Sequence, residues 1–238
     1  MGLRLEDVLQ PWRRPRWPAF LAGPGEPHAY MVYVGAGWAM ARLGGRPARF
    51  PSTADPLLRW LIIDGFGFHE GYFHATRVIE RQIVPPAVSG YARRAFDQGL
   101  GRSLWFVEGS AVDGISSTLS RFAESRHADL WSGVGLAAAY AGGVEPAAYI
   151  RLRERAGAHA PGVAQGAAFA AKARLRAGLG AAHTECACEI LCGMSAIEAA
   201  AVTDQALEQL PDGDAANPAY DHWRRRIRAH FSLERAAA

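Results

Sequence analysis

Residues suited to acid–base chemistry gather in one stretch, His69-Glu70-Gly71-Tyr72-Phe73-His74. The stretch resembles the His-Glu-x-x-His motif of zinc proteases, but its second histidine comes one residue late. If one helix covers it, Glu70 and His74 share a face, whereas His69 and His74 lie about 140° apart around the axis. That angle argues against a set of zinc ligands. The catalytic candidates His69, Glu70 and His74 are therefore a Glu–His acid–base pair or, alternatively, hydrogen-bonded polar residues lining a groove.

Polar residues also recur directly before short glycine motifs at regular intervals. These Gly-x-Gly or Gly-x-Ala cores begin at Gly35, Gly65, Gly99, Gly133 and Gly166, and the residues before them are Val34, Asp64, Gln98, Ser132 and Gln165. Because equivalent positions of stacked repeats form a line, polar side chains beside aromatic ones predict a groove for a long, mostly apolar ligand. The candidate ligand-binding residues are Asp64, Asp97, Gln98, Arg102, Gln165, Trp38 and Trp105. A ladder of buried hydrogen bonds between helices would give the same pattern and stays open as the alternative.

Three other patterns carry little sign of a cofactor. The core at Gly35 follows an apolar run but has Met40 where a dinucleotide-binding motif requires Gly or Ala. The three cysteines within residues 186–192 lack zinc-site spacing, which favours buried structural cysteines. We therefore predict neither a cofactor nor a metal. Residues 223–231 predict a basic amphipathic helix that either is solvated or faces an anionic surface or acidic carrier domain.

Composition narrows the class of protein. The 238 residues are 50% apolar and 21% charged, which excludes a disordered tail, a disulfide scaffold and a collagen-like fibre. The net charge of +3 is too small to imply a nucleic-acid partner. Lys172 is the only lysine among 26 basic residues, a bias typical of GC-rich, actinobacterium-like genomes. With three clustered cysteines, no apolar leader and no long apolar run, we expect a cytoplasmic protein.

The spacing of the glycine cores predicts the elements that position these residues. Successive cores are separated by 30, 34, 34 and 33 residues, the length of an antiparallel helix pair. We therefore expect an all-α fold of antiparallel helix-pair repeats, a TPR-like α-solenoid with a period of about 34 residues, as a single domain over residues 1–238. Each glycine inside a helix costs about 1 kcal/mol relative to alanine, so close packing of neighbouring helices must offset it. C-caps are expected at Gly44, Gly109, Gly142 and Gly178.

The remaining helices follow from the same register. Partner helices are expected over residues 55–63, 113–123, 146–156 and 185–192, and a last pair over 195–209 and 218–231 would cap the array. One period before Gly35 lies Gly2, so the first helix is expected to be truncated. Its open end, near Leu3, Leu5 and Val8, would favour a homodimer.

Six blocks of the sequence together resemble a known family, the UnbL-type enediyne biosynthesis proteins. The blocks are Phe20-Leu-Ala-Gly-Pro-Gly, Val34-Gly-Ala-Gly-Trp-Ala, Asp64-Gly-Phe-Gly-Phe-His-Glu-Gly-Tyr-Phe-His, Arg93-Arg-Ala-Phe-Asp-Gln-Gly-Leu-Gly-Arg-Ser-Leu-Trp-Phe, Asp129-Leu-Trp-Ser-Gly-Val-Gly-Leu-Ala and Ala164-Gln-Gly-Ala-Ala-Phe-Ala. The likeness runs from about Pro18 to the C-terminal helix, and it implies a chain shortened at its N-terminus relative to other members.

The resemblance implies a role in antibiotic biosynthesis. Family members are encoded beside an iterative polyketide synthase, so the expected function is to act on or hold the polyene intermediate during enediyne core formation. The partners it implies are the polyene, the polyketide synthase and companion proteins, one of them in the membrane. The family carries no established catalytic residues, so whether the protein is an enzyme stays open. The alternative is a non-catalytic helical-repeat scaffold that binds the synthase or its companions.

Overall fold

The computed structural model describes residues 16–45 and 54–237, and throughout these ranges all regular structure is helical. The α-helices are α2 (Arg16–Leu21), α3 (Ala29–Arg42), α4 (Trp60–Phe73), α5 (Tyr91–Val107), α6 (Val112–Ser120), α7 (Glu124–Ala141), α8 (Pro146–Ala156), α9 (Ala160–Arg176), α10 (Ala182–Cys192), α11 (Ala196–Gln205) and α12 (Ala219–Ala237). A π-helix, η1, covers Thr76–Glu80, and a 3₁₀ turn, η2, covers Gly157–His159. The expected open end at Leu3, Leu5 and Val8 lies outside the described residues.

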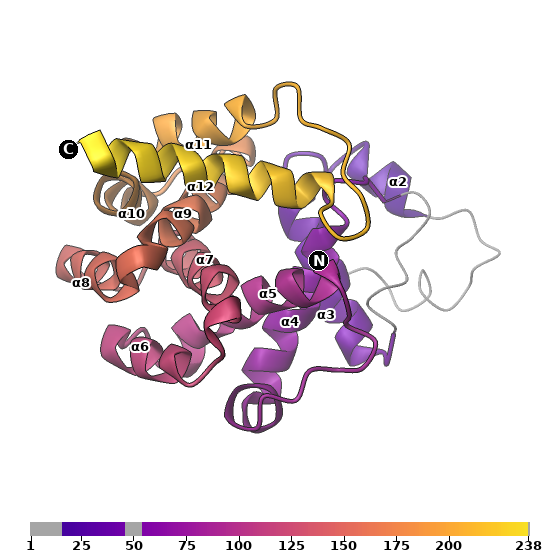
Figure 1. Ribbon diagram of the computed structural model, residues 1–238. Coiled ribbons are helices and arrows are strands. Elements are labelled where there is room, and N and C mark those ends of the chain that lie inside the picture. Colours follow the sequence, from indigo (N-terminus) through magenta and orange to yellow (C-terminus); the bar gives the residue numbers. More distant parts are fainter. Residues whose placement is uncertain (1–15, 46–53, 238) are drawn as a thin grey trace.

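Five helices, α3, α4, α5, α7 and α9, pack side by side in chain order (Figure 1). The glycine cores lie at their contacts. A β-carbon on Gly65 would collide with the carbonyl oxygen of Val34 in α3, and one on Gly67 would collide with that of Phe96 in α5. The first glycine of a core thus faces the preceding helix and the second faces the following one.

The same contact repeats along the row. The carbonyl oxygens opposite Gly99, Gly133 and Gly166 are those of Asp64, Gln98 and Ser132, the residues that precede the neighbouring cores. Such approach of two backbones allows Cα–H···O contacts and dense packing, which offset the helix-propensity cost of glycine. Gly35 differs, because nothing lies within 4 Å of the place where its β-carbon would be.

Helices α6, α8 and α10 form a second layer, and each follows a member of the row in the chain. Helix α8 contacts both α6 and α10, and each of the three packs on helices of the row (Figure 1). The partner helices expected over 113–123, 146–156 and 185–192 are thereby confirmed. The expected caps are confirmed as well: Gly44, Gly109, Gly142 and Gly178 have positive φ one or two residues after a helix ends.

The helix expected over 55–63 is wrong. Residues 56–59 form a turn, and Trp60 begins α4, which continues through the glycine core to Phe73. No turn interrupts the apolar run Trp60–Ile63 and the core that follows it, so the two belong to one helix. After α4 the chain forms only η1 before α5 begins, so the second layer has no helix there.

The last pair is found at α11 and α12, but α12 does more than close the end of the array. Ser195 caps α11 with a capping box to Glu198. Helix α12 packs on α9 and α11 and then runs along the row (Figure 1), so that Tyr220 reaches the rings of α5. The two ends of the row lie close together, because Arg176 at the end of α9 pairs with Glu26 just before α3 at 2.6 Å.

Among the described residues, no single helix combines the length and apolarity needed to cross a membrane. Taken together, α10 and α11, bent by 65° at the break between them, pass that test by length and composition.

Candidate functional site

The residues that precede the glycine cores form one line across the row, which we call the polar row: Val34, Asp64, Gln98, Ser132 and Gln165. All five are buried. The Gln98 side-chain amide donates to Asp64 Oδ2 at 2.9 Å, and the Ser132 hydroxyl donates to Gln165 Oε1 at 2.8 Å. Helix α12 covers this line, because Gln98 also bonds the Tyr220 hydroxyl and Arg224 Nε approaches Gln165 Oε1. The polar row is therefore a hydrogen-bonded ladder between helices and not the wall of an open groove.

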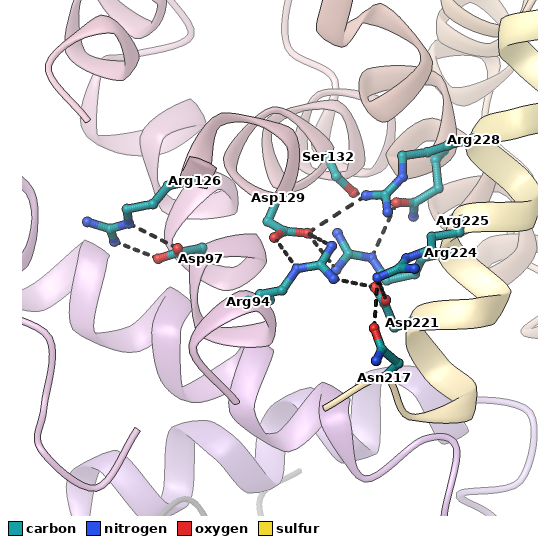
Figure 2. A network of polar contacts seen from close by, with 11 residues as sticks. Arg94, Asp97, Arg126, Asp129, Ser132, Asn217, Asp221, Arg224, Arg225 and Arg228 are labelled. Carbon is teal, nitrogen blue, oxygen red and sulfur yellow. Dashed lines mark hydrogen bonds and ion pairs between the residues drawn. The ribbon is translucent and has the colours of Figure 1, made fainter. Parts of the chain in front are cut away.

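About one helical turn before the polar row, an ion network fixes α12 to the row of helices (Figure 2). Asp129 of α7 pairs with Arg94 Nε of α5 at 2.9 Å and with Arg224 Nη1 of α12 at 2.8 Å. Arg94 in turn pairs with Asp221 at 2.7 Å. Three helices thus share these charges; Asp129, Asp221 and Arg224 are almost fully removed from water, whereas the side chain of Arg94 is about one-third exposed. Removing one of the buried charges would leave its partners uncompensated.

The two buried aspartates of this region respond differently to their surroundings. Burial favours the neutral acid of Asp129, but Arg224 and Arg94 outweigh it and hold the pKa of Asp129 below its usual value. Asp97 has one arginine partner, Arg126, at 2.5 Å (Figure 2), and here burial prevails and raises its pKa. The difference lies in the number of guanidinium groups around each carboxylate.

A second line lies one to two helical turns after the polar row, on the same side of the same helices. We call it the aromatic row and define it as Trp38, Phe68, Tyr72, Phe106, Tyr140 and Phe169. Phe68 stacks on Phe106 with ring centroids 5.5 Å apart and meets the Trp38 indole edge-on at 5.2 Å. Tyr72 and Phe106 expose 46% and 41% of their surface, so this line opens to solvent at the α3–α5 end.

At the α7–α9 end the aromatic row enters an apolar cavity. Its lining comes from six helices and consists of Tyr30, Met31, Val34, Leu61, Arg102, Leu136, Tyr140, Phe169, Lys172, Ala173 and Trp223. The cavity itself is about 30 Å³, within about 450 Å³ of empty space that is partly open to solvent. Arg102 connects it to the open end, because its guanidinium pairs with Asp64 and lies 4.8 Å from the Phe68 ring centre.

His69, Glu70 and His74 lie together at the open end of the aromatic row. Glu70 Oε1 is 3.2 Å from His69 Nδ1 and 3.4 Å from His74 Nδ1. Glu70 Oε2 pairs with Arg77 of η1. Glu70 and His74 lie on one face four residues apart, as expected. The rings of His69 and His74, expected about 140° apart around the axis, nevertheless have centroids only 5.8 Å apart, and His74 follows the end of α4 with a non-helical backbone (φ −131°, ψ 38°). The argument against a set of metal ligands therefore fails.

This group mixes buried and exposed members. His69 and Glu70 are buried, whereas the side chain of His74 is half exposed. Burial lowers the pKa of His69 although Glu70 acts to raise it, so the surroundings favour the neutral imidazole. Its Nε2 has no hydrogen-bond partner among the described residues, and its ring stands perpendicular to Trp38 at 5.5 Å, where an N–H can face the indole. A neutral imidazole beside a carboxylate can transfer a proton or bind a metal.

The other residues expected to bind ligand lie elsewhere. Asp97 pairs with Arg126 away from the polar row, and the Trp105 indole is buried with its N–H donated to the Gly142 carbonyl at 3.3 Å. Sequence reasoning missed Arg94 and Asp129. Arg94 and Asp129 each lie about one turn before the polar-row residue of their own helix. Their opposite charges at equivalent positions of neighbouring helices could have predicted an ion pair.

The remaining sequence patterns have structural explanations. Cys188 and Cys192 are buried, with sulfurs 3.9 Å and 3.4 Å from the carbonyl oxygens of Ala167 and Ala164. The basic run of α12 contributes Arg224, which is fully buried, while Arg225 is half exposed. This helix therefore has one face against the row and one towards solvent.

The geometry defines an all-helical protein with a glycine-packed row of helices, an apolar cavity along that row and a histidine–glutamate group at one end. The chain belongs to the family described as Protein of unknown function (DUF1702), whose model matches residues 1–231. No curated protein and no solved structure is detectably similar to it.

Proposed function

We propose that the protein binds a long, conjugated apolar chain along its aromatic row and that this chain is the polyene intermediate of enediyne core formation. The identity of the ligand rests on the resemblance to UnbL-type proteins. Its place rests on one observation: the aromatic row joins an apolar cavity to an exposed aromatic end that carries His69, Glu70 and His74. Flat conjugated chains stack favourably on aromatic rings.

The proposed ligand lies along the aromatic row and does not touch the polar side chains of the polar row. Asp64, Gln98 and Gln165 are fully buried beneath α12, so a ligand could not touch them unless that helix left. Arg102 and Trp38 keep their proposed roles, because Arg102 lines the cavity and Trp38 belongs to the exposed end. A cavity of about 30 Å³ is small for a polyene, so Tyr30, Lys172 and other half-exposed lining side chains must turn outward on binding.

Binding can be measured with parinaric acid, a fluorescent conjugated tetraene. We expect its fluorescence to rise on binding to the wild-type protein. Ala173→Trp should fill the cavity and weaken binding about tenfold or more, equivalent to about 1.4 kcal/mol. The matched control is Ala147→Trp, the same substitution at an exposed position of α8. Equal affinity of the two variants would place the probe outside the cavity and contradict the proposed site.

The pathway is tested by reconstitution. The polyketide synthase is incubated with and without this protein, and the products are identified by mass and ultraviolet spectrum. A change in polyene products that needs the wild-type protein supports the proposal. Identical products in both reactions would contradict an action at this stage.

The rival proposal is a scaffold that binds the synthase or companion proteins, including a membrane protein. Exposed apolar side chains on the outer helices favour it, namely Ile150 of α8, Leu179 after α9 and Ile197 of α11. A scaffold predicts that the protein co-purifies with the synthase and that Ala173→Trp leaves its function intact. Nucleic acid is not an expected partner under either proposal.

We further propose a helical-repeat architecture, a cytoplasmic location and a homodimer for this protein. The alternation of row and second-layer helices in chain order, α5 then α6, α7 then α8, and α9 then α10, supports a TPR-like α-solenoid in which α3 and α4 have no second-layer helix after them. A cytoplasmic location in an actinobacterial producer would fit the expected partners. A homodimer through the N-terminal end is tested by sedimentation of the full chain, in which a single monomeric species would contradict it.

A further inference from the structure

The contacts of Glu70 Oε1 are unusual, because two imidazole nitrogens approach the same carboxylate oxygen. His69 Nδ1 lies at 3.2 Å and His74 Nδ1 at 3.4 Å, and ligand atoms of all three residues lie within 4.8 Å of one another. Nitrogen and oxygen ligands at about 2.0–2.2 Å from a tetrahedral metal ion are about 3.3–3.5 Å apart. We propose that His69, Glu70 and His74 bind one divalent first-row transition-metal ion.

Two imidazoles and one carboxylate are a common donor set for such ions. Without an ion, His69 and His74 would both have to donate an Nδ1–H to one oxygen at distances near the limit of a hydrogen bond. With an ion, the three groups offer lone pairs to a common centre. The structure brings the three groups together at the C-terminal end of α4 and the residue that follows it, with both imidazole nitrogens at ligand spacing from Glu70 Oε1.

Arg77 supports this arrangement from outside. It pairs with Glu70 Oε2, which leaves Oε1 for the ion and fixes the orientation of the carboxylate. Its side chain is half exposed, so its positive charge is shared with solvent and partly screened from the ion. Trp38 and Phe73 pack against the His69 ring and hold it in place.

The site also has an open side. His74 and Arg77 line a solvent-open cavity of about 590 Å³, together with Tyr72, Phe73, Ala75, Thr76, Arg81 and Ile83. Three protein ligands leave at least one coordination position for water or for an oxygen or nitrogen atom of a small molecule. The ion would lie where the aromatic row meets solvent, at the exposed rings of Tyr72 and Phe73.

A second group, Glu124, His127 and His159, offers similar ligand types and serves as an internal comparison. Glu124 is 78% exposed there, and it divides its oxygens, with Oε1 near His159 and Oε2 near His127. That carboxylate is not oriented by burial or by an arginine. We therefore assign the ion to the Glu70 group alone.

The test is titration of the chelator-treated full-length protein with Co²⁺, followed by visible absorption and calorimetry. We expect one equivalent to bind with ligand-field bands and Zn²⁺ to displace it. His74→Ala and Glu70→Gln should each weaken Co²⁺ binding by at least the roughly 10–100-fold that follows loss of an outer-shell partner. His159→Ala is the matched control and should bind as wild type. Circular dichroism confirms that each variant remains helical.

Three results would overturn the assignment: no absorption bands with the wild-type protein, unchanged binding by His74→Ala, or loss of binding in His159→Ala. His74→Ala is the decisive variant, because its side chain is half exposed and its removal leaves the core intact. The readout is metal binding alone. It stands or falls independently of parinaric acid binding and of the proposed role in enediyne formation.

Discussion

The polar row and the aromatic row lie one to two helical turns apart on the same five helices, yet they have opposite surroundings. Helix α12 covers the polar row at Gln98 and Gln165, which bond Tyr220 and Arg224, and the four polar side chains of the row bond in two pairs. The aromatic row borders a cavity at one end and solvent at the other, and Trp223 is the residue of α12 that lines that cavity. Coverage by α12 therefore separates polar residues that stabilise the fold from residues available to a ligand.

Arg102 shows how the two rows depend on each other. Its guanidinium pairs with Asp64 of the polar row while it lies over Phe68 of the aromatic row. A buried arginine that is neutralised in this way can line an apolar cavity without an isolated charge. The polar row thus supplies the counter-charge for the ligand site.

The largest effect on stability is expected at Asp129. Asp129→Asn leaves Arg94, Arg224 and Arg228 crowded without their shared anion, which should lower the free energy of unfolding by about 3–5 kcal/mol. Crowding is already visible in Arg228, because burial and Arg224 lower its pKa to about 10. Urea denaturation measures the change.

The control for Asp129 is an aspartate with similar partners on the surface. Asp113 pairs with Arg151 and Arg155, and all three side chains are more than half exposed. Asp113→Asn should change stability by less than about 1 kcal/mol. Equal losses of stability in the two variants would mean that burial beneath α12 does not make an ion pair more important for stability.

The next largest effect is expected where helices touch backbone to backbone. Gly133→Ala would place a β-carbon on the carbonyl oxygen of Gln98, so we expect a loss of about 1–3 kcal/mol in the free energy of unfolding. Gly35→Ala is the matched control, because Gly35 is also inside a helix but has open space around it. Alanine is the better helix former, so Gly35→Ala should stabilise by up to about 1 kcal/mol. A loss in both variants would remove close packing as the reason for the glycines.

The contributions of Asp129 and Asp97 to stability should change in opposite directions with pH. The lowered pKa of Asp129 means that its stabilisation is present above its unfolded pKa, about 3.9, and is lost as pH falls through its folded pKa. The raised pKa of Asp97 means the reverse: its contribution is present below the unfolded pKa and is lost as pH rises through the folded pKa.

Between pH 2 and 6, the stability of wild type relative to Asp129→Asn should therefore grow with rising pH. The stability of wild type relative to Asp97→Asn should fall with rising pH over the same range. Equilibrium denaturation of the three proteins at several pH values measures both slopes. Slopes of the same sign would show that the number of arginine partners does not distinguish the two carboxylates.

Much of the helical framework follows from local signals in the sequence. Gly109 and Gly142 end helices because they adopt positive φ, and Pro146 begins α8 at the expected residue. The helix expected over 55–63 is wrong because the apolar run from Trp60 and the glycine core after it belong to one helix, α4, and not to two. Local patterns locate helices well when a cap is present and poorly when one helix contains two patterns.

The candidate site was harder to predict because it depends on long-range contacts. The polar spacing of Asp64 and Gln98 fitted a groove and a hydrogen-bonded ladder equally, and the position of α12 decides between them. The His69–Glu70–His74 group was misjudged because its geometry depends on where α4 ends. His74 directly follows the last residue of α4, and no glycine or proline at position 74 or 75 marks that end in the sequence.

The smallest effect on stability is expected at His74, and it tests whether the open end of the aromatic row is functional. In the presence of chelator, His74→Ala should change the free energy of unfolding by less than about 1 kcal/mol, because the side chain is half exposed and Glu70 keeps His69 and Arg77. Denaturation of both proteins under identical conditions measures the difference. A loss as large as that of Asp129→Asn would show that the His69–Glu70–His74 group stabilises the fold. The exposed end of the aromatic row would then not differ in role from the polar row.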